Sequence, residues 1–105
     1  MRGALADGPL ARAEAIFRGL AAERLATLQA ARERLMRGGP DEGPARDQIA
    51  ATVHKIGGTA ATLGFARLGQ DAARVERLMA TNAPTDAILP ALKPVIDGLA
   101  ALGGD

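Results

Sequence analysis

The only histidine of the chain, His54, stands in a segment whose residue types and spacing suit a chemical role. A neutral imidazole keeps one nitrogen lone pair free, so histidine is a nucleophile near neutral pH. Residues three, four and seven positions away share its face of a helix. Around His54 these are only alanines and glycines, namely Ala50, Gly57, Gly58 and Ala61. The segment therefore predicts a docking site for another protein, centred on one reactive histidine.

The apolar residues around His54 predict a helix that turns the imidazole toward solvent. They recur at spacings of four, three, four and three residues, at Ile49, Val53, Ile56, Ala60 and Leu63. At 3.6 residues per turn these positions form one core-facing stripe, and His54 lies roughly 130° from its centre. Consecutive glycines inside a helix cost about 1 kcal/mol each relative to alanine. The close approach of a partner would compensate for that cost at Gly57 and Gly58.

These residues resemble the signature of the histidine-containing phosphotransfer (HPt) domain family. In that signature an aliphatic residue follows the histidine at two positions, often lysine and then glycine at three and four, a small residue at five and glycine at ten. This chain has Ile56, Gly57, Gly58, Thr59 and Gly64 at those places. Many members carry a lysine at position 57 that helps neutralise the phosphoryl group. Lys55 is nearby, but it points about 200° around the helix from position 57.

The resemblance implies a fold and a function for the whole chain. The fold would be an all-α, antiparallel up-and-down four-helix bundle, formed by residues 1–105 as one stand-alone domain. His54 would accept a phosphoryl group from the aspartate of one receiver domain and pass it to another in a two-component phosphorelay. The partners would be response-regulator receivers and hybrid histidine kinases, and the Mg²⁺ would sit on the receiver. The chain itself would be a monomeric carrier without a cofactor, not an enzyme.

Glu76 lies 22 positions after His54, where several HPt members have a residue that hydrogen-bonds to Nδ1 of the ring. The apolar stripe of its segment is flanked by an edge that contains Gly69, Ala73 and Glu76. A carboxylate that accepts a hydrogen bond from Nδ1–H fixes the tautomer and leaves the Nε2 lone pair free. The alternative is a solvated glutamate near Arg74 or Arg77. Lys55 has two interpretations as well. It could attract the phosphoryl group or an acidic receiver surface, or it could be a solvated lysine without a functional role.

Proline, glycine and apolar spacing divide the chain into four helical segments. We expect helices over about residues 9–36, 44–63, 65–81 and 86–101, with 1–8 and 102–105 as loose ends. Because glycine can either interrupt a helix or be tolerated in it, Gly19 leaves two alternatives for the first segment. It could be one helix, or a short N-terminal helix followed by a longer one. Its buried stripe is expected to include Ile16, Phe17 and Leu20 at the N-terminal end. Pro90 and Pro94 lack a backbone donor, so they should kink the last helix or delay its start.

The turns between these segments have residues typical of helix ends. Asp41 or Gly43 is expected to cap the helix that carries His54, with Pro44 in its first turn. Gly64 supplies the left-handed residue that ends many helices, and Phe65 is expected to pack back on the last turn.

Composition excludes several other classes of function. The chain has no cysteine and one histidine, so disulfides and cysteine-based metal sites are excluded. Thirteen basic and twelve acidic residues give a net charge of +1, and only two residues are aromatic, which argues against nucleic-acid binding. No apolar run approaches the roughly 18–20 residues of a membrane span. We expect a cytoplasmic protein without a signal sequence.

Two alternatives to the phosphocarrier use the same fold. The chain could dock on receivers or on a histidine kinase and regulate them by sequestration, without carrying phosphate. The absence of lysine at Gly57 permits this second function. A third possible function is dimerisation through a plain helical bundle, but this function would not account for two glycines on the solvent side of a helix.

Overall fold

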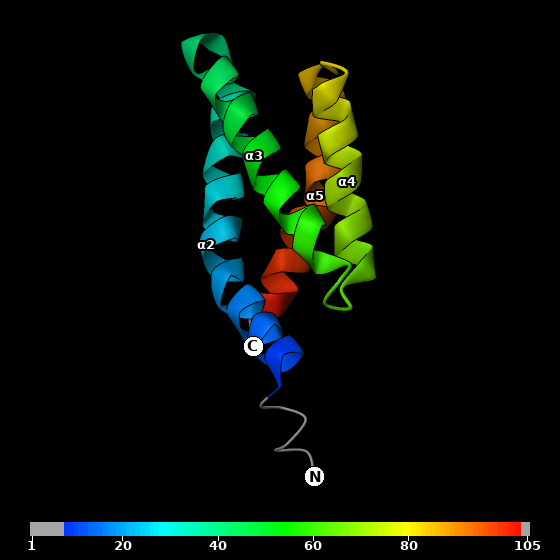
Figure 1. Cartoon of the computed structure of the whole chain (residues 1–105). Coiled ribbons are helices and arrows are strands. Elements are labelled where there is room, and N and C mark those ends of the chain that lie inside the picture. The colour runs from blue at the N-terminus through cyan, green and yellow to red at the C-terminus, as the bar shows by residue number, and fades with distance from the viewer. Residues whose placement is uncertain (1–7, 104–105) are drawn as a thin grey trace.

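The computed structural model describes residues 8–103, and these residues form a bundle of four α-helices with no strand (Figure 1). The elements are α2 (Pro9–Arg37), the 3₁₀ turn η1 (Gly39–Asp41), α3 (Glu42–Ala60), α4 (Ala66–Ala80) and α5 (Thr85–Gly103). Successive helices run in opposite directions, as the colour gradient of Figure 1 shows. Each helix packs on two neighbours, because α3 lies against α2 and α4 while α5 contacts the same two helices. The expected up-and-down four-helix bundle is confirmed.

Helix α2 is one continuous helix of 29 residues, so Gly19 does not divide it and no short extra helix precedes it within the described residues. Pro9 stands in its first turn, and Arg34 and Arg37 lie near its negative C-terminal end. Phe17 begins its buried stripe, as expected. The prediction for Ile16 and Leu20 was wrong, because these side chains lie about 60–100° around the helix from that stripe and are exposed.

Helix α3 begins two residues earlier than expected, at Glu42, with Asp41 before it. Asp41 makes no side-chain capping bond. The helix ends at Ala60, and the chain turns through Gly64, whose φ of 93° is left-handed as predicted. Phe65 donates its backbone N–H to the carbonyl of Ala60, but its ring stacks on Phe17 of α2 at 5.4 Å between centroids. The turn therefore ties α3 to α2 as well as to α4.

Helix α5 contains both prolines and begins at Thr85, so it does not start late. Pro90 and Pro94 each remove a hydrogen bond to the carbonyl four residues earlier. In Figure 1 the first part of α5 runs beside α4 and its last part leans toward α2, as expected of a proline-kinked helix. Leu102 and Gly103 belong to this helix and are not a loose end. Residues 1–7 and 104–105, where the other expected loose ends fall, lie outside the described residues.

Aliphatic side chains from all four helices fill the core between them. The largest fully buried ones are Leu28, Leu35, Ile49, Val53, Ile56, Val75, Ile88, Leu92, Val95 and Leu99. Burying a side chain of this size contributes about 1.5–3 kcal/mol, so these contacts fix how each helix is rotated about its axis. Because Ile49, Val53 and Ile56 of α3 point into the core, the face of α3 that carries His54 must point outward.

Candidate functional site

His54 lies in the C-terminal half of α3, on the side of the helix that faces away from the core. Its side chain is 75% exposed, although Val53 directly before it is fully buried. The exposed imidazole is thus held on a rigid helix and not on a loop, which fixes its position relative to the bundle. The sequence prediction of a solvent-exposed histidine in mid-helix agrees with this placement.

Glu76 of α4 reaches the His54 ring from the neighbouring helix. Its Oε2 lies 2.5 Å from Nδ1, so the carboxylate and the ring are in direct hydrogen-bond contact. A carboxylate accepts hydrogen bonds, so Nδ1–H is the donor and the Nε2 lone pair remains free. Within the described residues Glu76 forms no ion pair with Arg74 or Arg77. The geometry therefore favours the histidine contact over the solvated glutamate that was its alternative.

The four small residues predicted around His54 lie in two different settings. Gly58 and Ala61 are exposed, and a Cβ built on Gly58 would meet nothing within 4 Å. Ala50 and Gly57 are half-buried, because they lie on the side of α3 that faces α4. A Cβ on Gly57 would lie 3.8 Å from Cβ of Ala72 and 3.9 Å from Oε1 of Glu76. The small residues that are exposed to solvent on the face of His54 are therefore those at positions 58 and 61.

Lys55 lies on the opposite side of α3 from Glu76. It lines a cavity of about 330 Å³ between α2 and α3, which Glu23 and Arg24 of α2 also line. Lys55 makes no ion pair with another described residue. The structure thus brings Glu76 and Gly57 together at His54 and places Lys55 toward α2.

Two apolar residues of α2 that were expected in its buried stripe lie on the surface, next to cavities that residues of α3 also line. Ile16 is 63% exposed and Leu20 is 36% exposed on α2. Both line a cavity of about 250 Å³ that also includes Thr59, five residues after His54 on α3. Leu20 lines the neighbouring cavity with Lys55 as well. An angular count around α2 would have placed both residues at the edge of the stripe, since Phe17 and Ala21 mark its centre.

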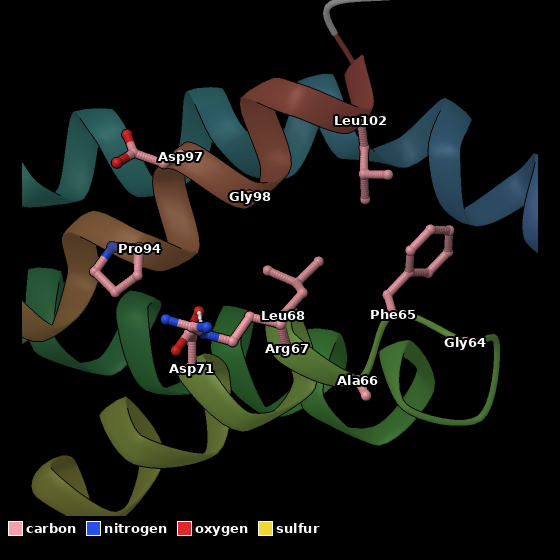
Figure 2. A pocket seen from close by; sticks show the side chains of 10 residues that line it. All are labelled: Gly64, Phe65, Ala66, Arg67, Leu68, Asp71, Pro94, Asp97, Gly98 and Leu102. Atoms are coloured by element: carbon pink, nitrogen blue, oxygen red, sulfur yellow. Dashed lines mark ion pairs between the residues drawn. The ribbon is translucent and has the colours of Figure 1, made fainter.

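A larger cavity, of about 450 Å³, lies away from His54 between α4 and α5 (Figure 2). Figure 2 shows Phe65 and Leu102 at one end of it, and Arg67 and Asp71 of α4 drawn together as an ion pair. Neither His54 nor Glu76 lines this cavity. In the described part of the chain, no three His, Cys, Asp or Glu side chains are grouped so as to hold a metal ion. None of the helices described is long and apolar enough to cross a membrane.

Comparison with known protein families gives a match to the model of the Hpt domain over residues 15–102. The searches of curated proteins and of solved structures gave no match. The matched segment includes the whole of α3 and α4, and so both partners of the contact between His54 and Glu76. It also covers most of the 105 residues. The four-helix bundle is typical of Hpt domains, and the chain belongs to the Hpt family of histidine phosphotransfer domains.

Proposed function

We propose that His54 carries a phosphoryl group between the aspartates of receiver domains in a two-component phosphorelay. The observation that carries the proposal is the geometry of the ring, whose side chain is 75% exposed and bound to Glu76 at Nδ1. Membership of the Hpt family supports a role in phosphorelays in general. The assignment of the phosphoryl group to His54 rests on the ring being the only imidazole in the chain.

The chemical step follows from this arrangement. The Nε2 lone pair attacks the phosphorus atom of an aspartyl phosphate on the receiver, the bond from phosphorus to the carboxylate oxygen breaks, and the carboxylate leaves. The Nδ1 proton stays on the ring, which becomes positively charged as the N–P bond forms. Glu76 stabilises that charge, as an aspartate does for the imidazolium of a catalytic triad. The reverse step, with a second receiver as acceptor, returns the ring to its neutral form.

The receiver supplies what phosphoryl transfer needs beyond a nucleophile. In this proposal the Mg²⁺ that neutralises the phosphoryl oxygens belongs to the receiver. The chain then acts as a carrier and not as an enzyme, and it needs no cofactor of its own. We further propose that it works as a monomer in the cytoplasm, where receivers and the cytoplasmic parts of hybrid kinases are found.

The receiver is proposed to dock on α3 around His54 and to extend over the exposed edge of α2. Gly58 and Ala61 leave room for its backbone beside the ring. Ile16 and Leu20 offer an apolar contact that the α3–α4 face lacks, and exposed apolar side chains beside a functional group are typical of binding surfaces. The proposed docking surface therefore extends beyond the residues around His54 that the sequence indicated.

The second candidate function is sequestration of receivers or of a kinase without phosphate transfer. The observation that favours it is that position 57, where many family members have a lysine, holds glycine. Comparing wild type with His54→Ala separates the two functions. If the carrier proposal holds, the variant binds a receiver with unchanged affinity but neither accepts its phosphoryl group nor supports signalling in cells. A variant that keeps the cellular effect would favour sequestration.

A further inference from the structure

Exposed apolar residues form a row along the N-terminal half of α2. Leu10 is 62% exposed, Ile16 63% and Leu20 36%. Ala13, which lies between the first two, is exposed as well. Their spacings of three, three and four residues place them on one side of the helix, within about 120° of each other. A row of this kind is typical of a surface that another helix covers.

The position of α2 in the bundle leaves this row uncovered. Figure 1 shows the first turns of α2 beyond the loop that joins α3 to α4. Leu10 lies seven residues, or about two turns, before Phe17 and continues its side of the helix, but Phe17 is buried and Leu10 is not. Ile16 and Leu20 lie at the edge of that side and line the cavity that also includes Thr59. Within the described residues, no helix covers the row.

Two residues of opposite charge flank the row. Arg12 and Glu23 are eleven residues apart, a spacing that turns by only about 20° around a helix, so both lie on the same flank of α2. Both are exposed, and neither forms an ion pair with another described residue. Ile16 and Leu20 lie between them along the helix. The midpoint of the charged residues therefore nearly coincides with the midpoint of the apolar ones.

We propose that two copies of the chain pair through this face of α2, with the two helices antiparallel. In such a pair the same flanks of the two helices face each other, and residues equally far from a common centre lie opposite one another. A centre between residues 17 and 18 sets Arg12 of each copy opposite Glu23 of the other, and Ile16 beside Leu20. A twofold axis relates the copies, so each contact is made twice and the assembly closes as a dimer.

Pairing regulates the proposed function, because it covers residues that the receiver needs. Ile16 and Leu20 belong to the docking surface proposed above, so the paired form cannot bind a receiver there and the monomer is the form that transfers. An interface made by one helix of each copy is small, and we expect a weak dimer with a Kd on the order of 0.1 mM. The effect on receivers rests on the proposed function, whereas the pairing itself does not.

Sedimentation equilibrium between about 10 μM and about 1 mM of the purified protein tests the pairing. Wild type is expected to change from monomer to dimer over this range. Arg12→Glu and Glu23→Arg each set like charges opposite one another at two places, so each is expected to raise the Kd about tenfold. The double variant restores opposite charges and is expected to return to the wild-type Kd. Glu33→Arg reverses an exposed charge of α2 outside the row and is expected to change nothing.

Wild type that stays monomeric at the highest concentration would overturn the proposal, as would a double variant that pairs no better than either single one. Circular dichroism checks that each variant is folded. Neither result would touch the phosphocarrier function, since no receiver is present. Conversely, a wild-type protein that pairs as expected but accepts no phosphoryl group from a receiver would refute the carrier function and leave the pairing standing.

Discussion

Oε2 of Glu76 lies 2.5 Å from Nδ1 of His54 and joins the middle of α3 to α4. Ala61, seven residues after His54, directly follows the end of α3 and meets Gly69, which lies seven residues, or about two turns, before Glu76 on α4. There a Cβ on Gly69 would lie 3.3 Å from both the backbone nitrogen and Cβ of Ala61. Small residues therefore bring α4 close to the end of α3 about two turns from the histidine contact.

Removing the Glu76 carboxylate should slow transfer without unfolding the protein. Charge-assisted hydrogen bonds contribute about 1.5–3 kcal/mol when buried. Because the Glu76 side chain is 40% exposed, we expect less, about a two- to fivefold slower phosphoryl acceptance in Glu76→Ala. Glu76→Gln retains an acceptor and should lie between this variant and wild type. Glu33→Ala, at an exposed glutamate of α2, is the control and should accept phosphate at the wild-type rate.

Substituting alanine for glycine should have opposite effects at two helical positions. In Gly19→Ala the new Cβ meets nothing within 4 Å, so helix propensity alone should raise the free energy of unfolding by about 0.5–1 kcal/mol. Gly69→Ala must push against the backbone of Ala61, and overpacking of about 1–3 kcal/mol should outweigh the same gain. Thermal unfolding measures both. A Gly69→Ala protein as stable as Gly19→Ala would show that the helices are not held at this distance.

The order and type of the helices could be predicted from sequence because they depend on local signals. Apolar spacing placed Val53 and Ile56 in the core and His54 outside, and Gly64 at the end of its turn was recognisable as a left-handed residue. These features follow from the period of the helix and from the freedom of glycine. The same helical period placed Glu76 on one edge of the apolar stripe of its helix. The resemblance to the family then suggested that the Glu76 carboxylate bonds to Nδ1 of His54.

The sequence did not reveal how each helix is rotated against its neighbours. Ile16 and Leu20 lie at the edge of the stripe of α2, and their apolar type alone does not tell whether a neighbouring helix covers that edge. Likewise, the small residues around His54 look equivalent on a helical wheel. The packing of α4 is what half-buries Gly57 and leaves Gly58 open. Gly19 could not be assigned because a single glycine neither breaks nor preserves a helix by itself.

Bulk at position 58 should block docking and leave the fold intact. A leucine introduced by Gly58→Leu would stand in open space beside the ring, where the receiver backbone is proposed to approach. We expect at least tenfold slower transfer with an unchanged circular dichroism spectrum. Ala30→Leu, which adds a leucine at an exposed position of α2 away from Ile16 and Leu20, serves as the control and should transfer normally. Normal transfer by folded Gly58→Leu would refute the docking surface on α3.

A charge at Ile16 should weaken receiver binding if the docking surface extends to α2. Ile16 and Met36 are both 63% exposed, but Met36 lies at the opposite end of α2 and lines neither of the cavities that α2 forms with Lys55 and Thr59 of α3. Ile16→Asp should raise the Kd for the receiver about tenfold, which corresponds to about 1.4 kcal/mol. Met36→Asp should leave it unchanged. Titration calorimetry with a purified receiver measures both, and equal affinities would confine the surface to α3 and α4.

The most direct test of the phosphocarrier function is the intact mass of the protein after incubation with a phosphorylated receiver. We predict a gain of about 80 Da, for one phosphoryl group in place of a proton. The added mass should be lost on acid treatment, as expected of a phosphohistidine, and should be absent from His54→Ala. Wild type that binds the phosphorylated receivers and hybrid kinases of its own cell without gaining this mass would contradict the account.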